Sequence, residues 1–306
     1  MFELHAEGYT ALIDPEHGGN CVRLSRYGAE ILRTPKSAAD RDENPFFYGT
    51  PLLFFPNRIS EGCFVFEGRE YRLPVNEPST GCFLHGTMHR TAFEVIRQNE
   101  QSASLRYLAT DREPYLTFPH AFEVDQEWSF SPAGLRQTVT VTNRSRLDMP
   151  VALGSHTTFR LPFTADSRPD EITMRLDTGA EYSRNMQTYL PDGKVFTDYP
   201  DRDALRQGTF VPAPCRMSRL FRMGSSKTLT LTDPRGHVQM TYEALKGYHY
   251  WMVYNGLSPD FLCVEPQSWL SNCPNAPFPR EETGFDCLMP GESRVYETLL
   301  SIHFLS

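Results

Sequence analysis

Two neighbouring segments, FEVDQEWSF (residues 122–130) and LRQTVTVTN (residues 135–143), show most directly how this chain folds. The first places its large apolar side chains on one side of a period-two pattern, at Phe122, Val124, Trp128 and Phe130. The second sets Val139 and Val141 against alternating threonines. Period-two alternation of aromatic and β-branched residues is typical of strands that bury one face. Both segments are therefore predicted to be β-strands.

The same pattern extends along most of the chain. It recurs in TLTLTD (228–233), HVQMTYEA (237–244) and RVYETLLSIHF (294–304). The segment FVFEGREYRLP (64–74) predicts a hairpin that turns at Glu67-Gly68-Arg69, because glycine supplies the turn conformation. A helical pattern is nearly absent, and DRDALRQ (201–207) is expected to form a single turn or a short helix at most.

Turn-forming residues separate these segments. The 24 prolines and 20 glycines fall mostly between the strand candidates and do not gather into a linker. Many short strands divided by turn signals are typical of an all-β sandwich or barrel. No internal repeat is evident. We therefore expect one all-β domain over residues 1–306.

Charge and hydropathy exclude several classes of protein. The formal net charge is -8 and no long basic run is present, so a nucleic-acid partner is not expected. No apolar stretch approaches the ~18 residues of a membrane span, and MFELHAEGYT lacks the features of a signal peptide. The seven cysteines are scattered without a C-x-x-C pair. These features predict a cytoplasmic protein without a nucleic-acid or membrane partner.

Four stretches place polar groups in aromatic or proline-rich surroundings. They are FPNRI (55–59), LHG (84–86), GSHTTF (154–159) and CVEPQ (263–267). Glu265 follows an apolar strand that is expected to end at Pro266. Burial at such a place raises the pKa of a carboxyl group, which suits a general base that works near neutral pH. The alternative is a glutamate at the end of a strand that pairs with an arginine.

His156, Arg58 and His85 each allow a structural and a functional interpretation. Small residues before His156 leave room for a ligand, whereas the alternative is a histidine with a purely structural role. Arg58 beside an apolar run offers several donors to the hydroxyl groups of a sugar. The alternative for Arg58 is a surface ion pair with Glu61 or Glu67.

The spacing of His85 and His89 resembles that of a metal-binding pair, but the rest of the motif is missing. No glutamate follows His85, Gly86 weakens any helix, and no third ligand is near in sequence. The glycine-rich motifs of dinucleotide and phosphate sites and the nucleophile elbow are also absent. We therefore expect no metal and no cofactor.

Taken in chain order, these motifs resemble the aldose 1-epimerase (galactose mutarotase) family. The likeness covers most of the chain, and its parts are HGGNCVRLSRYGAEILR (17–33), LLFFPNRISEGCFVFEGREYRLPVN (52–76), FLHG (83–86), GSHTTFRLPF (154–163), DFLCVEPQSWLSNCPNA (260–276) and TGFDCLMPGES (283–293). The resemblance implies a large antiparallel β-supersandwich with an open carbohydrate cleft. It further implies a monomer or homodimer that acts on a monosaccharide (an aldose) without a metal or redox cofactor.

The resemblance also assigns roles to five residues. Glu265 matches the general base and His156 the general acid of a sugar 1-epimerase (mutarotase). Arg58 and His85 match the residues that hold the sugar, and Asn57 assists them.

One departure concerns the choice of sugar. Family members often bind the sugar with an aspartate in an L-D-D-x-F stretch, whereas residues 205–210 here read LRQGTF and lack it. The closest alternative is a hexose-6-phosphate 1-epimerase, for which His89-Arg90 is the one suggestive feature. A non-catalytic sugar-binding or regulatory protein is a second alternative. A glycosidase ranks last, because it usually needs two carboxylates and only Glu265 is well placed by motif.

Overall fold

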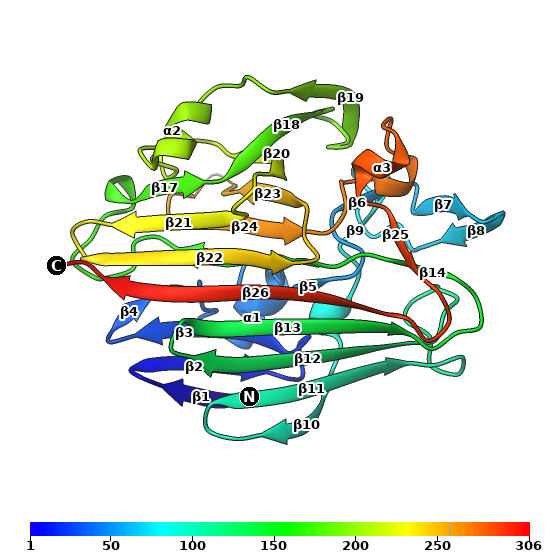
Figure 1. The fold of residues 1–306 in the computed structure, drawn as a ribbon, viewed down its shortest axis with the longest axis horizontal. Helices are drawn as coiled ribbons and strands as arrows, with labels where there is room; N and C mark the ends of the chain where they lie inside the picture. Colours follow the sequence, from blue (N-terminus) through cyan, green and yellow to red (C-terminus); the bar gives the residue numbers. More distant parts are fainter. Residues whose placement is uncertain (257) are drawn as a thin grey trace.

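Two eight-stranded antiparallel sheets form the main layers of the computed structural model, which describes residues 1–256 and 258–306 (Figure 1). In spatial order the first sheet consists of β10 (Glu94–Gln98), β11 (Ser102–Ala109), β12 (Phe122–Ser131), β13 (Gly134–Asn143), β26 (Ser293–Phe304), β22 (Val238–Lys246), β21 (Thr228–Asp233) and β17 (Thr173–Leu176). The second consists of β19 (Pro191–Phe196), β18 (Thr178–Arg184), β20 (Ser218–Met223), β23 (Tyr250–Tyr254), β24 (Phe261–Gln267), β15 (Gly154–Ser155) and β5 (Leu52–Leu53), and β16 (Thr158–Arg160) also pairs with β24.

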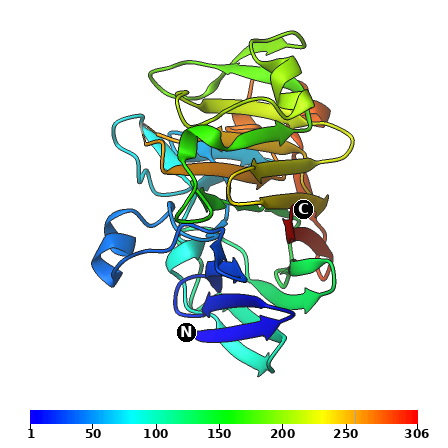
Figure 2. The ribbon, with the colours of Figure 1, turned by 90° about the vertical axis from the view of Figure 1, so that its left-hand side faces the viewer.

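Smaller elements surround these two sheets. They are the four-stranded sheet β1 (Phe2–Ala6), β2 (Tyr9–Asp14), β3 (Asn20–Arg26) and β4 (Ala29–Glu30), and the pairs β14 (Met149–Val151) with β25 (Asp286–Leu288), β6 (Arg58–Ser60) with β9 (Cys82–Leu84), and β7 (Cys63–Phe66) with β8 (Arg69–Arg72). The helices are α1 (Ala38–Glu43), α2 (Arg202–Gln207) and α3 (Arg280–Thr283), and the 3₁₀ turns are η1 (Met88–Arg90), η2 (Pro169–Glu171) and η3 (Cys273–Asn275). Figure 2 shows α1 projecting on the side away from the first sheet. Along the described chain, none of these helices has the length and apolar character that crossing a membrane requires.

The segments that suggested the fold are confirmed as strands. β12 and β13 form an antiparallel hairpin whose register pairs Phe122 with Asn143 and Trp128 with Gln137. β7 and β8 form the predicted hairpin, and both Glu67 and Gly68 adopt the positive φ that its two-residue turn requires. The short helix expected at residues 201–207 is α2. The all-β prediction is therefore correct.

The hydrophobic core lies between the two large sheets. Tyr242 of β22 is buried and contacts Phe159 and Trp251 of the second sheet, with ring centroids 5.7 and 6.2 Å away. The hydroxyl of Tyr242 also forms a hydrogen bond with Oγ1 of Thr157, at 2.9 Å. This bond ties the segment that carries His156 to the opposite sheet.

Period-two alternation decides which side chains of β24 leave the core. Leu262 and Val264 belong to the main hydrophobic cluster, so Glu265 and Gln267 lie on the opposite face of the sheet. Both polar side chains are nevertheless buried. The second sheet thus presents a carboxyl and an amide group to a covered hollow outside the core.

The expectation that the strand ends at Pro266 is wrong, since β24 continues to Gln267. The N–H groups of Val264 and Ser268 donate to the carbonyls of Thr157 and Leu153, on the side of β15 and β16. The nitrogen of Pro266 faces the same side, at the break between those two short strands. A proline is tolerated there because no ladder hydrogen bond is lost.

Candidate active site

All five residues singled out in the sequence line one cleft with a volume of about 600 Å³. The cleft lies over the face of β23 and β24 that points away from the core. Its residues come from four separate parts of the chain. They are Asn57 and Arg58 at the start of β6, His85 after β9, His156 between β15 and β16, and Glu265 in β24.

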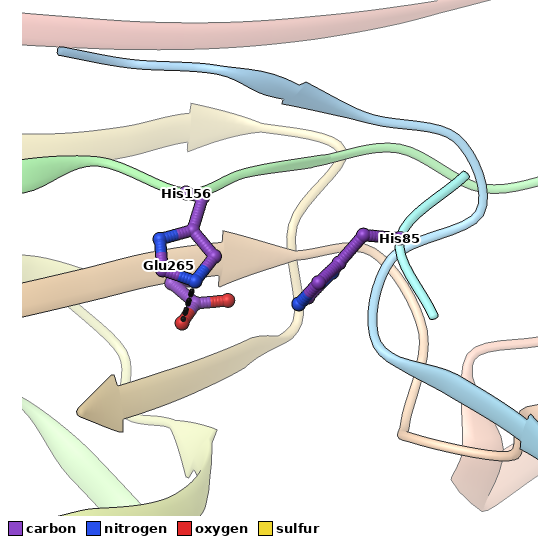
Figure 3. A group of neighbouring side chains, drawn as sticks. All are labelled: His85, His156 and Glu265. Carbon is purple, nitrogen blue, oxygen red and sulfur yellow. Dashed lines mark ion pairs between the residues drawn. The ribbon is translucent and has the colours of Figure 1, made fainter. Parts of the chain in front are cut away.

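Glu265 and His156 are in direct contact. The distance between His156 Nε2 and Glu265 Oε1 is 3.2 Å, and the two side chains are only 6% and 2% exposed (Figure 3). The backbone N–H of His156 donates to the carbonyl of Pro51, which fixes the short segment between β15 and β16. Glu265 therefore pairs with a histidine and not with an arginine.

Burial shifts the pKa values of the pair in opposite directions. Desolvation raises the pKa of Glu265 to about 8 and lowers the pKa of His156 to about 3. Both shifts favour the uncharged form of each group. Near neutral pH the pair therefore retains one proton, and its titration belongs to both residues together.

A relay of hydrogen bonds orients the carboxyl group of Glu265. Asn57 Oδ1 accepts from the backbone N–H of Arg58 and from the hydroxyl of Ser271, each at 3.0 Å. Because a backbone N–H can only donate, the amide nitrogen of Asn57 must face Gln267, and it donates to Gln267 Oε1 at 3.4 Å. Gln267 Nε2 then donates to Glu265 Oε2 at 3.0 Å. This donation favours the ionised carboxylate and opposes part of the effect of burial.

His85 presents a hydrogen-bond donor to the cleft. Its Nδ1 accepts from the backbone N–H of Asn57 at 3.1 Å. Burial holds the pKa of His85 well below its usual value, so the ring is neutral and its proton lies on Nε2. Figure 3 shows the ring of His85 pointing toward His156 and Glu265. His85 has a positive φ of 60°, a left-handed conformation that histidine adopts more readily than most residues.

Arg58 is held in one orientation by a carboxylate that was not considered in the sequence. Its Nε and Nη2 donate to the two oxygens of Glu77, both at 2.6 Å. The guanidinium also lies 4.8 Å from the ring centre of Tyr189. Its ion pair is therefore neither with Glu61 nor with Glu67. A two-pronged pair of this kind fixes the plane of the guanidinium beside the cleft.

His85, His156 and Glu265 each offer one ligand atom, and these atoms lie within 4.8 Å of one another. In His85, however, Nδ1 already accepts a hydrogen bond, and Nε2 carries the proton of the neutral ring. Such a nitrogen donates and offers no lone pair to a metal. The set therefore fits the oxygens of an organic ligand better than it fits a cation.

The phosphate interpretation of His89-Arg90 finds no support in their positions. His89 is buried against Phe46, at 4.3 Å between ring centres, and is not among the residues that line the cleft. Arg90 is exposed and donates to the carbonyl of Asp42. The two residues do not form a cationic pocket at the cleft.

Sequence reasoning missed two supporting residues, Gln267 and Glu77. Gln267 is two positions after Glu265, so the strand period places both on one face, and this signal was present in the sequence. Glu77 is separated from Arg58 by the hairpin of β7 and β8, and no local pattern indicates that they meet. Sequence reasoning also did not identify the aromatic residues that line the cleft, which are Phe46, Phe47, Tyr189 and Tyr254.

Comparisons with known proteins now add to this geometry. A family model described as aldose 1-epimerase matches residues 1–301. The chain belongs to the aldose 1-epimerase family. The resemblance stated from the sequence is thereby confirmed, and membership supports an isomerase of the sugar-epimerase kind.

A solved structure shares the fold of this aldose 1-epimerase family member, and two curated proteins match it in sequence. A galactose mutarotase-like protein from Clostridium acetobutylicum has a TM-score of 0.93 at 29% identity, with 99% of this chain and 95% of that chain covered. Two Escherichia coli K12 proteins described as uncharacterized, YphB and YihR, are 23% and 24% identical. The alignments cover 95% of this chain and 94% of YphB, and 94% of this chain and 87% of YihR. The galactose mutarotase-like fold implied by the sequence is confirmed.

In this family member, Gln267→Met is predicted to raise the pH at which kcat/KM falls on the alkaline side. Wild-type kcat/KM should fall through about pH 8, where the pair loses its last proton. Loss of a charge-assisted hydrogen bond of about 1.5–3 kcal/mol raises the pKa of Glu265 by about one to two units, and the alkaline decline of kcat/KM moves up by the same amount. A pH–rate profile measures this shift. An unchanged alkaline decline would show that Gln267 does not stabilise the carboxylate.

Gly86→Ala is predicted to destabilise the fold by about 2 kcal/mol more than Gly68→Ala. Both glycines have a positive φ, 70° and 72°. A Cβ at Gly86 would collide with the carbonyl of Phe54 and the hydroxyl of Tyr115, whereas a Cβ at Gly68 meets nothing within 4 Å. Urea unfolding of both variants measures the difference. Equal losses would mean that the conformational penalty alone acts at both positions.

Proposed function

We propose that the chain is a sugar 1-epimerase (mutarotase) that interconverts the α and β anomers of an aldose without a cofactor. One observation carries this proposal, namely the 3.2 Å separation of His156 Nε2 and Glu265 Oε1 at the cleft. Opening a hemiacetal requires proton transfer at two oxygens on the same carbon, the C1 hydroxyl and the ring oxygen. Two adjacent acid–base groups match that requirement.

In the proposed reaction, ionised Glu265 removes the proton from the C1 hydroxyl while protonated His156 donates to the ring oxygen. The bond between C1 and the ring oxygen breaks, and an open-chain aldehyde forms. Rotation about the C1–C2 bond then presents the other face of the aldehyde. The ring oxygen attacks that face, His156 recovers its proton, and Glu265 returns the proton that it removed. Each positioned acid or base typically contributes roughly 10²–10⁴-fold to the rate.

The shared proton of the pair suits a reaction that runs in both directions. Burial favours the arrangement with the proton on Glu265, and its movement to His156 produces the ionised pair used above. The two arrangements differ by one proton transfer across the 3.2 Å contact. Ring opening and ring closure therefore need no proton from outside the site.

The remaining predicted residues hold the sugar or the catalytic pair. Arg58 and neutral His85 both offer N–H donors to the oxygens of the substrate. Asn57 is a positioning residue, because it acts on Glu265 through Gln267. The aromatic walls offer flat apolar surfaces to the C–H faces of a sugar ring.

The regulatory and glycosidase alternatives are less well supported, and His89 and Arg90 are not the phosphate site of the third. Sugar binding alone does not require a buried acid–base pair, which argues against a purely regulatory role. A glycosidase needs a second free carboxyl group, and the other cleft glutamate, Glu77, is occupied by Arg58. The phosphate pocket expected of a hexose-6-phosphate 1-epimerase is not formed by His89 and Arg90.

Polarimetry of freshly dissolved α-D-glucose, α-D-galactose and α-D-glucose 6-phosphate tests the proposal. Catalytic amounts of the protein should accelerate the approach to anomeric equilibrium for at least one of these sugars. The inactive control is heat-denatured protein at the same concentration. If no aldose equilibrates faster than in buffer, while a sugar binds saturably, the non-catalytic alternative is correct.

A further inference from the structure

Four arginines lie in or beside the cleft, and two of them are neutralised. Arg58 forms its two-pronged pair with Glu77, and Arg219 forms a similar pair with Glu181, at 2.8 and 2.7 Å. Such pairs leave little net charge to attract a ligand. The other two, Arg184 and Arg216, are not neutralised in this way.

Arg184 is buried with one unsatisfied donor. Its Nη2 donates to the carbonyl and the hydroxyl of Ser218, the latter at 3.0 Å. Its Nη1 is buried and has no hydrogen-bond partner among the described residues. A buried cationic N–H without an acceptor costs free energy, so an acceptor supplied by a ligand would stabilise Arg184.

This donor borders the place where the substrate would lie. Arg184 lines a second hollow of about 440 Å³ that shares Met186, Ser218 and Arg219 with the cleft. The positive charges of Arg184 and Arg58 both lower the pKa of Glu265, against the larger effect of burial, which raises it. Arg184 forms no ion pair with Glu265 among the described residues.

Arg216 adds a second positive charge at the opening of the cleft. Its side chain is exposed and lines the cleft, and it forms no ion pair within the described part of the chain. The chain as a whole carries a formal net charge of -8. Asp198, which lines the second hollow, offsets part of this positive charge. The remaining excess on an acidic protein attracts anions to that place and speeds their association.

We propose that the preferred substrate is an aldose with an anionic substituent away from C1, such as a carboxylate or a phosphate ester. Arg184 and Arg216 bind that group while C1 lies against His156 and Glu265. This proposal rests on the proposed mutarotase function and assigns the class of its substrate. Arg184 supplies the buried donor, and Arg216 supplies the attraction from solution.

Equilibrium binding measured by isothermal titration calorimetry tests the proposal without relying on turnover. D-Glucuronate supplies the carboxylate, D-glucose 6-phosphate supplies the phosphate ester, and D-glucose is the neutral reference. At least one anion should bind roughly tenfold or more tightly than glucose, as expected for one charge-assisted hydrogen bond. Raising the salt concentration should weaken binding of the anion and leave binding of glucose unchanged.

Arginine variants test which residues cause the preference for the anionic sugar. Arg216→Gln should reduce the preference for the anion over glucose several-fold at low salt. Arg222→Gln is the matched control, because Arg222 is an exposed arginine of β20 that lines neither hollow. Arg184→Met should abolish the remaining preference. Since Arg184 is buried, its variant is interpreted only if its unfolding transition matches that of wild type, and Arg216→Gln tests the proposal independently.

The outcomes separate this proposal from the proposed function. If both anions bind no more tightly than glucose, or if Arg216→Gln and Arg222→Gln have equal effects, the anionic-substrate proposal is overturned. That result leaves mutarotase activity on neutral aldoses intact. If the anion binds preferentially but its anomers are not interconverted faster, the anion site stands and the mutarotase function fails.

Discussion

Glu265→Gln is expected to lower kcat for mutarotation by roughly 10²–10⁴-fold, because glutamine cannot accept the proton of the C1 hydroxyl. His156→Ala should lower it to a similar degree. The two residues share one proton, so they act as a unit and their losses are not additive. The double variant should therefore be no slower than the slower single variant. Polarimetry with the best aldose substrate gives all three rates.

A buried glutamate elsewhere in the chain provides the control for Glu265→Gln. Glu123 lies on β12 of the first sheet, where it contacts Arg144 and Arg106 and does not line the cleft. Glu123→Gln should retain wild-type activity. Full activity in either Glu265→Gln or His156→Ala would contradict the assigned roles, and strictly additive losses would contradict the shared proton.

Acidification from about pH 6.5 to 4 is expected to destabilise the fold. Burial lowers the pKa of His85 well below its usual value, and it lowers the pKa values of His89 and His156 to about 3. The unfolded chain takes up protons at these histidines near pH 6.5, whereas the folded chain does not. Their neutral burial is therefore compatible with full stability above that pH and costs stability as the pH falls.

The His156–Glu265 pair adds little to this effect between about pH 6.5 and 5. The folded pair holds one proton, because burial raises the pKa of Glu265 to about 8, and the unfolded chain holds one proton on His156. His89, whose pKa is lowered to about 3, costs about 2 kcal/mol at pH 5, at about 1.36 kcal/mol per pH unit below 6.5, and the burial of His85 acts in the same direction. A loss of this size is a large fraction of the total stability of many domains. Urea unfolding followed by circular dichroism across this pH range measures the loss. His89→Phe keeps an aromatic ring against Phe46 and should reduce the pH dependence of the free energy of unfolding by the amount that one buried histidine contributes. A free energy of unfolding that is constant from pH 7 to 5 would contradict this prediction.

The strands could be predicted from the sequence because the period-two alternation that indicates each strand lies within that strand's own residues. Residues 122–143 carry the alternation that places every second side chain in the core, and the hairpin at Glu67-Gly68 carries its own turn signal. The end of β24 was predicted wrongly because Pro266 normally interrupts a strand. Its tolerance depends on the break between β15 and β16, which the sequence around Pro266 does not encode.

The candidate site was predictable only in part, for a similar reason. His156 and Glu265 each remained ambiguous from their own surroundings, and the order of motifs along the chain selected them. Contacts between distant segments, such as Arg58 with Glu77, leave no local pattern. The unsatisfied donor of Arg184 depends on what surrounds it in three dimensions, so no local pattern indicates it.

The hydrogen bond between Tyr242 and Thr157 links the order of folding to the gain of activity. One partner comes from the first sheet, and the other is the immediate neighbour of His156 between β15 and β16. Enzymatic activity should therefore return during refolding only after the two layers have closed on each other, in the same kinetic phase as native tryptophan fluorescence. A fragment that contains only the second sheet lacks Tyr242 and is therefore expected to be inactive.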